Sequence, residues 1–186
     1  MAGPAAAAVS TRDDILRAAL TVVGEQGVAG LTNRRIAAAA GVSLGSLTYH
    51  FASQTELLRE AMLRFAEQEA AQLTALAEAH RAEGLGLEEV ARLVERVIEQ
   101  LPFGTNEIAA LELYLHAGRD GGLRESARRC FAGYDELATT VLTALGVPEP
   151  ERTATQVVAL IVGMQLRRLA TGEPQPAAEA LTRLVS

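Results

Sequence analysis

Apolar side chains recur every three or four residues along most of the chain, which is the spacing of one face of an α-helix. Between residues 12 and 26, for example, Ile15, Ala19 and Val22 share a face, and Gly27 follows as a stop signal. No long segment alternates polar and apolar residues with the period of two that is typical of a half-buried strand. The pattern therefore predicts an all-α protein.

Glycine and proline residues divide the helical pattern into about nine segments. We expect helices at residues 12–26, 33–40, two turns after Ser43, 54–81, 87–100, 105–118, 121–145, 150–171 and 176–185. The segment from Ser53 to Glu56 reads as a capping box that begins the long helix at residue 54. Residues 1–10 are expected to be a disordered lead-in.

Composition supports the helical class and argues against several kinds of chemistry. Hydrophobic residues make up 49% of the 186 residues and aromatic ones only 4%, so the expected core is mostly Ala, Leu and Val. The single cysteine, Cys130, excludes internal disulfides and thiolate zinc sites, and the three histidines lack metal-ligand spacing. We expect no metal, no cofactor and, without a catalytic triad or paired carboxylates, no enzymatic activity.

Charge is unevenly distributed along the sequence. All 17 basic residues are arginines and the net charge is -6, but residues 1–60 carry five arginines and five acidic residues and are neutral. Only this part of the chain is expected to face phosphate groups. No apolar run approaches the roughly 20 residues of a membrane span, and the N-terminus lacks the features of a signal peptide. The expected location is cytoplasmic, without a membrane partner.

The segment from residue 33 to residue 51 has the pattern of a helix-turn-helix. Ala37 is small where two helices would approach, Gly41 suits a left-handed turn, and Ile36, Val42 and Leu47 are apolar where the second helix must pack on the first. A helix-turn-helix places its second helix in the major groove of DNA. The same packing also occurs in helical proteins that do not bind DNA, so spacing alone leaves both readings open.

Two groups of residues in this segment are candidates for DNA contacts. The second helix would expose Leu44, Gly45, Ser46 and Thr48, and its glycine and short hydroxyl side chains would let the backbone approach the bases. Hydroxyl, imidazole and guanidinium donors near the helix ends suit phosphate oxygens; these are Thr32, Arg34, Arg35, Ser43, Tyr49 and His50.

Residues 11–60 resemble the N-terminal domain of the TetR family of transcriptional regulators. The resemblance is carried by G-V-S-x-G-S-L-x-Y-H-F at residues 41–51 and by S-x-x-E-L-L at residues 53–58. Two positions depart from the family pattern. Gln54, a further candidate for DNA contact, stands where the family commonly has a phosphate-binding lysine, and Thr48 stands where the family often has an aromatic residue.

The resemblance implies a repressor that leaves a palindromic operator in double-stranded DNA when a small organic effector binds. It also implies a homodimer and a division into a DNA-binding domain at residues 11–55 and a ligand-binding and dimerisation domain at residues 56–186. Independently, residues 157–169 are apolar on nearly all sides, which suits burial against both a core and a partner. The alternatives are a dimeric small-molecule-binding protein without operator recognition and a ligand-dependent activator.

A cavity among the C-terminal helices is expected to hold an apolar or amphipathic effector. The candidate lining residues are aromatic side chains, methionines and two members of a polar stripe at helical spacing: Met62, Phe65, Phe103, Glu112, Tyr114, His116, Tyr134 and Met164. An ordinary hydrophobic core with a solvated pair at Glu112 and His116 is the alternative interpretation.

Overall fold

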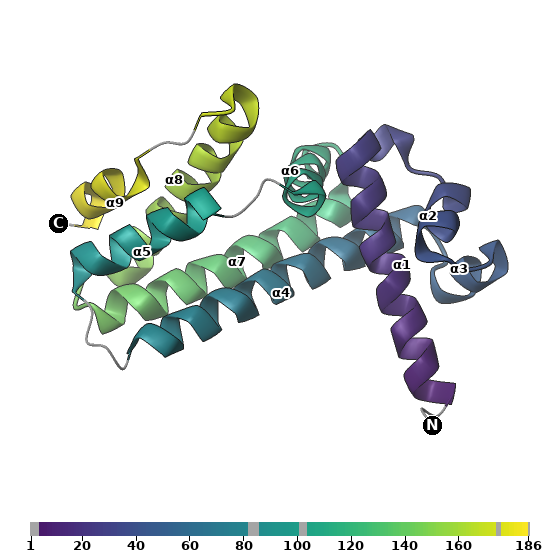
Figure 1. Cartoon of the computed structure of the whole chain (residues 1–186), viewed down its shortest axis with the longest axis horizontal. Coiled ribbons are helices and arrows are strands. Elements are labelled where there is room, and N and C mark those ends of the chain that lie inside the picture. The colour runs from purple at the N-terminus through teal and green to yellow at the C-terminus, as the bar shows by residue number, and fades with distance from the viewer. Residues whose placement is uncertain (1–3, 82–85, 101–103, 174–175, 186) are drawn as a thin grey trace. The chain divides into compact units, whose positions relative to one another are not determined.

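The computed structural model describes residues 4–81, 86–100, 104–173 and 176–185, and within these ranges it contains helices and no strand (Figure 1). The elements are α1 (Pro4–Gln26), η1 (Val28–Gly30), α2 (Asn33–Ala40), α3 (Leu44–His50), α4 (Gln54–Arg81), α5 (Leu87–Gln100), α6 (Thr105–Ala117), α7 (Gly121–Ala144), α8 (Pro150–Thr171) and α9 (Ala177–Val185). The predicted all-α class is confirmed. The bounds of α2 to α9 agree with the predicted ones to within one residue.

The N-terminal helix is longer than predicted. α1 begins at Pro4, so the expected start at residue 12 was wrong. Residues 4–10 of the expected disordered lead-in are helical, and residues 1–3 lie outside the described residues. Ala5 to Ala8 have the highest helix propensity of any residue type, and proline is favoured in the first turn of a helix. The short 3₁₀ turn η1 was not predicted either.

The residues form two compact units, which share α4 and α7 between them. The first consists of residues 1–66 and 104–130, and the second of residues 67–103 and 131–186. The first unit thus joins α6 and the beginning of α7 to the N-terminal helices. The functional division predicted at residues 55 and 56 concerns the roles of the segments and stays a prediction.

Helix α1 packs closely against α6 in the first unit. A Cβ atom added at Gly24 would lie 1.9 Å from the carbonyl oxygen of Thr105, which begins α6. Such a distance is far inside van der Waals contact, so only glycine fits this position. Around the contact, Ile15, Val23 and Leu113 are buried and supply apolar surface to the core of the unit.

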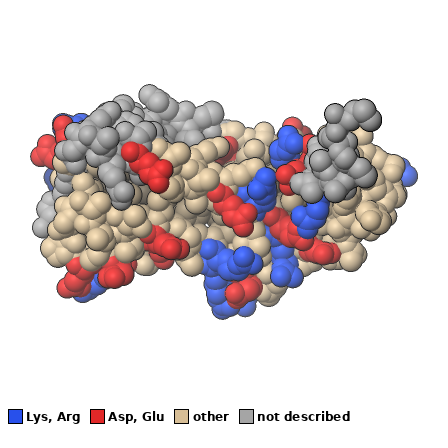
Figure 2. Space-filling view, turned by 90° about the horizontal axis from the view of Figure 1, so that it is seen from below, with Lys and Arg blue, Asp and Glu red and all other residues tan. Residues whose placement is uncertain are grey.

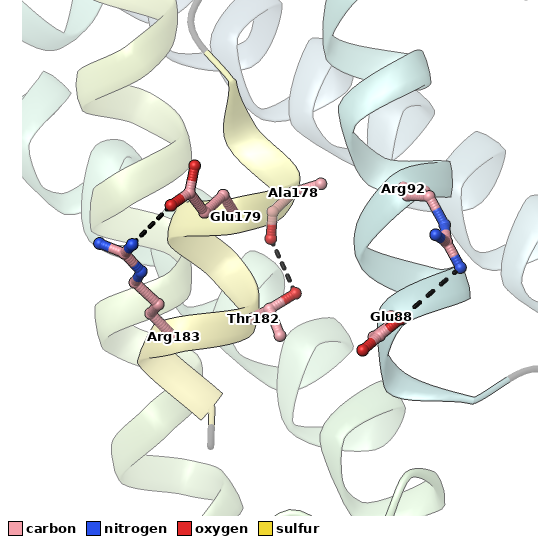
Figure 3. Close-up of a pocket in the computed structure, with 6 residues that line it drawn as sticks. All are labelled: Glu88, Arg92, Ala178, Glu179, Thr182 and Arg183. Carbon is pink, nitrogen blue, oxygen red and sulfur yellow. Dashed lines mark hydrogen bonds and ion pairs between the residues drawn. The ribbon is translucent and has the colours of Figure 1, made fainter.

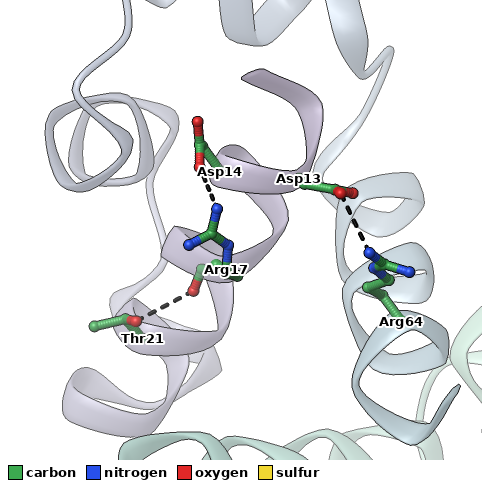
Figure 4. Close-up of polar contacts among 5 residues, drawn as sticks. All are labelled: Asp13, Asp14, Arg17, Thr21 and Arg64. Atoms are coloured by element: carbon green, nitrogen blue, oxygen red, sulfur yellow. Dashed lines mark hydrogen bonds and ion pairs between the residues drawn. The ribbon is translucent and has the colours of Figure 1, made fainter. Parts of the chain in front are cut away.

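Two ion pairs link α1 to α4 in the same unit. Figure 4 shows Arg64 reaching from α4 to Asp13 on α1, with 3.2 Å between Nη2 and Oδ2. Arg12 pairs with Glu60, and its guanidinium lies 4.9 Å from the centroid of the Phe51 ring. All four charged side chains are part-exposed, so each pair contributes about 0–1 kcal/mol to stability. The Arg12–Phe51 contact adds a cation–π attraction at the end of α3.

Helix α7 also meets α4 in the interior of the first unit. The thiol of Cys130, which is 3% exposed, donates a weak hydrogen bond to the carbonyl oxygen of Met62 across 3.8 Å. Cys130 thus behaves as a small buried apolar residue at this helix contact.

The second unit is held together by two apolar clusters. One contains Ala91 of α5 with Ala177 and Leu181 of α9, and Met164 of α8 packs against it. The other gathers residues from α7, the following turn, α8 and α9: Leu142, Val147, Ala154 and Val185. The amide of Ala178 donates a hydrogen bond of 3.0 Å to Glu95, so a side chain of α5 satisfies one of the free amides at the start of α9.

Candidate nucleic-acid interface and effector site

The turn between α2 and α3 is built by local hydrogen bonds. Thr32 caps α2 by accepting a hydrogen bond from the amide of Arg35 across 3.3 Å. Gly41 ends the helix with φ of 67°, in the left-handed region, and the amide of Val42 donates to the carbonyl of Ala37 across 2.9 Å. This is the bonding of a Schellman motif, and it confirms the predicted role of Gly41.

Helix α3 is fixed by its cap and by two buried side chains. Ser43 accepts a hydrogen bond from the amide of Ser46 across 3.1 Å, and Leu47 and Phe51 are 2% and 3% exposed. Both apolar residues point into the first unit, as predicted. Their burial leaves the opposite side of α3 on the surface (Figure 1).

The start of α4 carries the predicted capping box in a slightly different form. Ser53 accepts from the amide of Glu56 across 3.1 Å, while Glu56 accepts from the amide of Ala52 across 2.8 Å rather than from the cap residue itself. The box fixes the chain just after α3, so side-chain caps stand at the start of α3 and at the start of α4.

The outer face of α3 presents small, apolar and aromatic groups. Tyr49 is 85% and Leu44 is 52% exposed, and Gly45 and Thr48 are also exposed. Ser46 and His50 are half-buried. The rings of Tyr49 and His50 meet edge to face with 5.2 Å between centroids, which orders this end of α3.

The Thr48 hydroxyl is turned toward the backbone of its own helix. It donates to the carbonyls of Leu44 and Gly45, at 3.2 Å and 3.1 Å. Such bonding within the helix occupies the only hydroxyl proton of the side chain. The donor that was expected to read a base edge is therefore engaged in this structure.

The two arginines of α2 differ in their surroundings. Arg34 is exposed, and none of the described residues forms an ion pair with it. Arg35 is also exposed but donates a hydrogen bond of 2.6 Å to the carbonyl of Gly30, which ties α2 to η1. On the face shown in Figure 2, arginines and acidic residues lie interspersed.

Gln54 is engaged with a residue that sequence reasoning did not single out. Its amide nitrogen donates a hydrogen bond of 3.0 Å to the side-chain oxygen of Asn33. Asn33 is the first residue of α2 and Gln54 the first of α4. The bond therefore joins the N-termini of two helices, both of which attract anions through their free amides.

The candidate effector residues of the first unit lie in different surroundings. Met62 and Phe65 of α4 are buried in its core. Glu112 of α6 is exposed beside the turn between α1 and η1, and Tyr114 and His116 of α6 are half-buried. The polar stripe predicted on this helix thus begins on the surface, while the two apolar candidates are internal.

In the second unit, Tyr134 and Met164 are half-buried. Tyr134 donates a hydrogen bond to Glu69 of α4, and its ring meets that of Phe131 edge to face with 6.4 Å between centroids. Glu69 and Phe131 were not predicted as effector residues. Phe131 lies one helical turn before Tyr134, and this spacing could have indicated that the two rings are neighbours. Met164 packs into the α5–α9 cluster, and Phe103 lies outside the described residues.

A surface groove of about 250 Å³ lies between α5 and α9. Figure 3 shows its lining: Glu88, Arg92, Ala178, Glu179, Thr182 and Arg183. Arg183 pairs with Glu179 at 2.6 Å and Arg92 with Glu88 at 3.9 Å, so its charges are matched. None of the predicted effector residues lines this groove, and its charged walls do not suit an apolar ligand.

Among the described residues, no group of three or more His, Cys, Asp or Glu side chains is placed to hold a metal ion. None of the helices described is both long enough and apolar enough to cross a membrane.

A capped helix-turn-helix followed by a larger set of helices defines the class of helical DNA-binding regulators. Residues 15–61 match the family model of bacterial regulatory proteins of the tetR family, and residues 85–186 match the tetracyclin repressor-like C-terminal domain. The chain belongs to the TetR family of transcriptional regulators. Proteins of this family regulate transcription and are not enzymes.

Solved structures support this assignment along nearly the whole chain. A TetR-family member from Streptomyces coelicolor A3 is 36% identical, with 95% of this chain and 98% of that chain covered and a TM-score of 0.75. The multidrug binding protein EbrR complexed with ethidium is 34% identical, with 95% and 99% covered and a TM-score of 0.76. EbrR has also been solved with malachite green and with proflavin. No curated protein matches the sequence.

Proposed function

We propose that this regulator is a repressor that binds a palindromic operator as a homodimer and is released by a small organic effector. The observation that carries the proposal is the exposed outer face of α3, a helix held by the Ser43 cap, by the capping box of the following helix and by the buried Leu47 and Phe51. A helix presented in this way fits the major groove of DNA. Leu44 and Tyr49 are 52% and 85% exposed on this face.

The proposed contacts divide by their chemistry. Base edges are contacted from α3 by Leu44, Gly45, Ser46 and Thr48. Phosphates are contacted by hydroxyl, imidazole, guanidinium and amide groups near the helix ends: Thr32, Arg34, Arg35, Ser43, Tyr49, His50 and Gln54. The converging N-termini of α2 and α4 support the assignment of Gln54, because their amides attract a phosphate without a formal charge.

Replacing Gln54 by lysine is expected to strengthen binding to operator and scrambled duplex alike. The lysine adds one phosphate contact, so the slope of log affinity against log salt concentration should steepen by about 0.9. Fluorescence anisotropy over a salt series measures this slope. Gln72→Lys is the control, because it adds the same charge to an exposed position of α4 far along the helix. Equal slopes for both variants would contradict the phosphate role of position 54.

The homodimer is proposed to form through the exposed side of α8. Leu166 and Leu169 are 45% and 37% exposed there, and no atom lies within 4 Å of a Cβ added at Gly163. Large apolar groups beside an open glycine suit close packing of a partner helix. A dimer is also what a palindromic operator requires, since each half-site receives one recognition helix.

Sedimentation at micromolar concentration is expected to give twice the chain mass of 19.6 kDa. Leu166→Glu should shift the protein to the monomer, because the new carboxylate would be buried without a partner in the interface. Gln72→Glu places the same charge on an exposed part of α4 and should leave the mass unchanged. A wild-type monomer would contradict the dimer and the two-half-site operator with it.

The effector is proposed to be an apolar or amphipathic organic molecule with an aromatic ring system. EbrR binds ethidium and malachite green, both of which are aromatic cations. In this chain, Tyr134 and Phe131 supply aromatic surface and Glu69 supplies a carboxylate in the same unit. Within the second unit we assign effector contacts to these three and to Met164. The other predicted candidates, Met62, Phe65, Phe103, Glu112, Tyr114 and His116, stay predictions.

Two measurements test the function. The full chain is mixed with fragmented genomic DNA, and the retained fragments should share a palindromic sequence. Malachite green is then added to the complex with one such fragment, and the protein should dissociate, whereas Glu69→Gln should require more dye. Retention without release by dyes would overturn the effector class. Dye binding without retention of any DNA would favour the alternative, a small-molecule-binding protein without operator recognition. The zero net charge of residues 1–60 is consistent with that alternative.

A further inference from the structure

The recognition helix lacks the side chains that read guanine and adenine most directly. Residues 44–50 are Leu-Gly-Ser-Leu-Thr-Tyr-His, without arginine, lysine, asparagine or glutamine. Guanine is commonly read by two hydrogen bonds from arginine or lysine, and adenine by two from asparagine or glutamine. Base selection by the centre of α3 must therefore use contacts in the major groove other than these paired hydrogen bonds.

Thr48 presents its γ-methyl group to DNA rather than a hydrogen-bond donor. Its hydroxyl proton is engaged with the carbonyls of Leu44 and Gly45, at 3.2 Å and 3.1 Å, although the residue itself is exposed. The γ-methyl group and the oxygen lone pairs are what remain for a contact with DNA. Of these, the methyl group gains by leaving water.

Leu44 adds a second apolar group on the same side of the helix. It is 52% exposed and lies one turn before Thr48, so the two side chains are neighbours on the surface of α3. Gly45, next to Leu44, has no side chain that would rise between the helix and the bases. A Cβ at this position would meet only the Ser43 hydroxyl oxygen, at 3.8 Å, so no other part of the protein covers it. The result is a small apolar surface, formed by Leu44 and the γ-methyl group of Thr48, on the outer face of α3.

The major groove contains one apolar group of matching size, the C5-methyl group of thymine. We propose that α3 selects its half-site through thymine methyl groups, with Leu44 and the γ-methyl of Thr48 packing against them. The proposal rests on the proposed function, in which α3 enters the major groove. It assigns hydrophobic contact, rather than hydrogen bonding, as the source of base selectivity at these two residues.

Deoxyuridine tests this directly, because it differs from thymidine only by the missing methyl group. Duplexes that bind the full-length chain are first selected from a random-sequence library. In the selected half-site each thymine is then replaced singly by deoxyuridine, and affinity is measured by anisotropy at one salt concentration. At one or more positions the affinity should fall about fourfold, the effect of one methyl group leaving an apolar contact.

Protein variants then identify the partners. Leu44→Ala or Thr48→Ser, which remove carbon and leave the helix ends intact, should abolish the deoxyuridine penalty at one position each. Ser46→Ala is the matched control, and its complex should keep the full penalty whatever its overall affinity. The coupling between protein change and base change isolates the methyl contact.

Tight binding to the selected duplex with no penalty at any deoxyuridine would overturn the proposal and leave the proposed operator recognition standing. A penalty that persists unchanged in both Leu44→Ala and Thr48→Ser would also overturn the assignment to these residues. Failure of the library to yield any binding duplex would overturn the operator recognition and this inference together.

Discussion

Replacing Gly24 by alanine is expected to lower the melting temperature by about 6–12 °C. The new Cβ would lie 1.9 Å from the Thr105 carbonyl oxygen and 2.7 Å from its carbonyl carbon. Backbone atoms cannot rotate away, so α1 and α6 must separate, and overpacking of this kind costs about 3 kcal/mol. For a protein of this size each kcal/mol corresponds to about 2–4 °C.

The matched control is Gly133→Ala in α7. No atom lies within 4 Å of a Cβ at this position, which is also inside a helix. Alanine is favoured over glycine in helices by about 0.8–1 kcal/mol, so this variant should melt slightly higher than the parent. Circular dichroism gives the melting temperatures of the parent, Gly24→Ala and Gly133→Ala for this comparison. If Gly24→Ala is as stable as Gly133→Ala, the close approach of α1 and α6 is wrong.

Replacing Gly45 by leucine is expected to reduce operator affinity about tenfold to a hundredfold while leaving the fold intact. Only the Ser43 hydroxyl oxygen, at 3.8 Å, lies near a Cβ at position 45, so a side chain meets no obstacle within the protein. It would instead project toward the DNA and hold the helix away from the bases. The loss corresponds to about 1–3 kcal/mol, the scale of one good base contact.

Gly45→Ala serves as the graded control, because its single methyl group should cost less affinity than the leucine side chain. Melting temperatures of both variants should equal or exceed that of the parent, since both residues favour a helix more than glycine does. Affinities for operator and scrambled duplex are compared at one salt concentration. Unchanged operator binding by Gly45→Leu would mean that another face of α3 meets the DNA.

The helix-turn-helix was predictable because its determinants are local in the sequence. The caps Thr32, Ser43 and Ser53 each accept a hydrogen bond from an amide three residues later, and Gly41 supplies a left-handed turn. Such rules operate within one helical turn. They failed at α1, where the alanines before residue 12 simply extend the helix to Pro4.

Contacts between distant segments were beyond this reasoning. The Gln54–Asn33 bond joins residues 21 apart in the sequence, and the Tyr134–Glu69 bond joins residues 65 apart. Neither partner is marked by a local pattern, so Asn33 and Glu69 were missed. The engagement of the Thr48 hydroxyl was missed for a different reason: a hydroxyl within a helix has its own backbone as a competing acceptor.

The buried thiol of Cys130 makes the interior of the first unit accessible to kinetics. A thiol reagent cannot reach a side chain that is 3% exposed against the Met62 carbonyl until α4 and α7 part locally. Because the chain has no second cysteine, every reacted molecule reports this one opening. When opening and closing are fast, the labelling rate at different reagent concentrations measures the free energy of that opening in the native protein. Cys130 is thus a natural probe of local opening between α4 and α7, and no engineered label is needed.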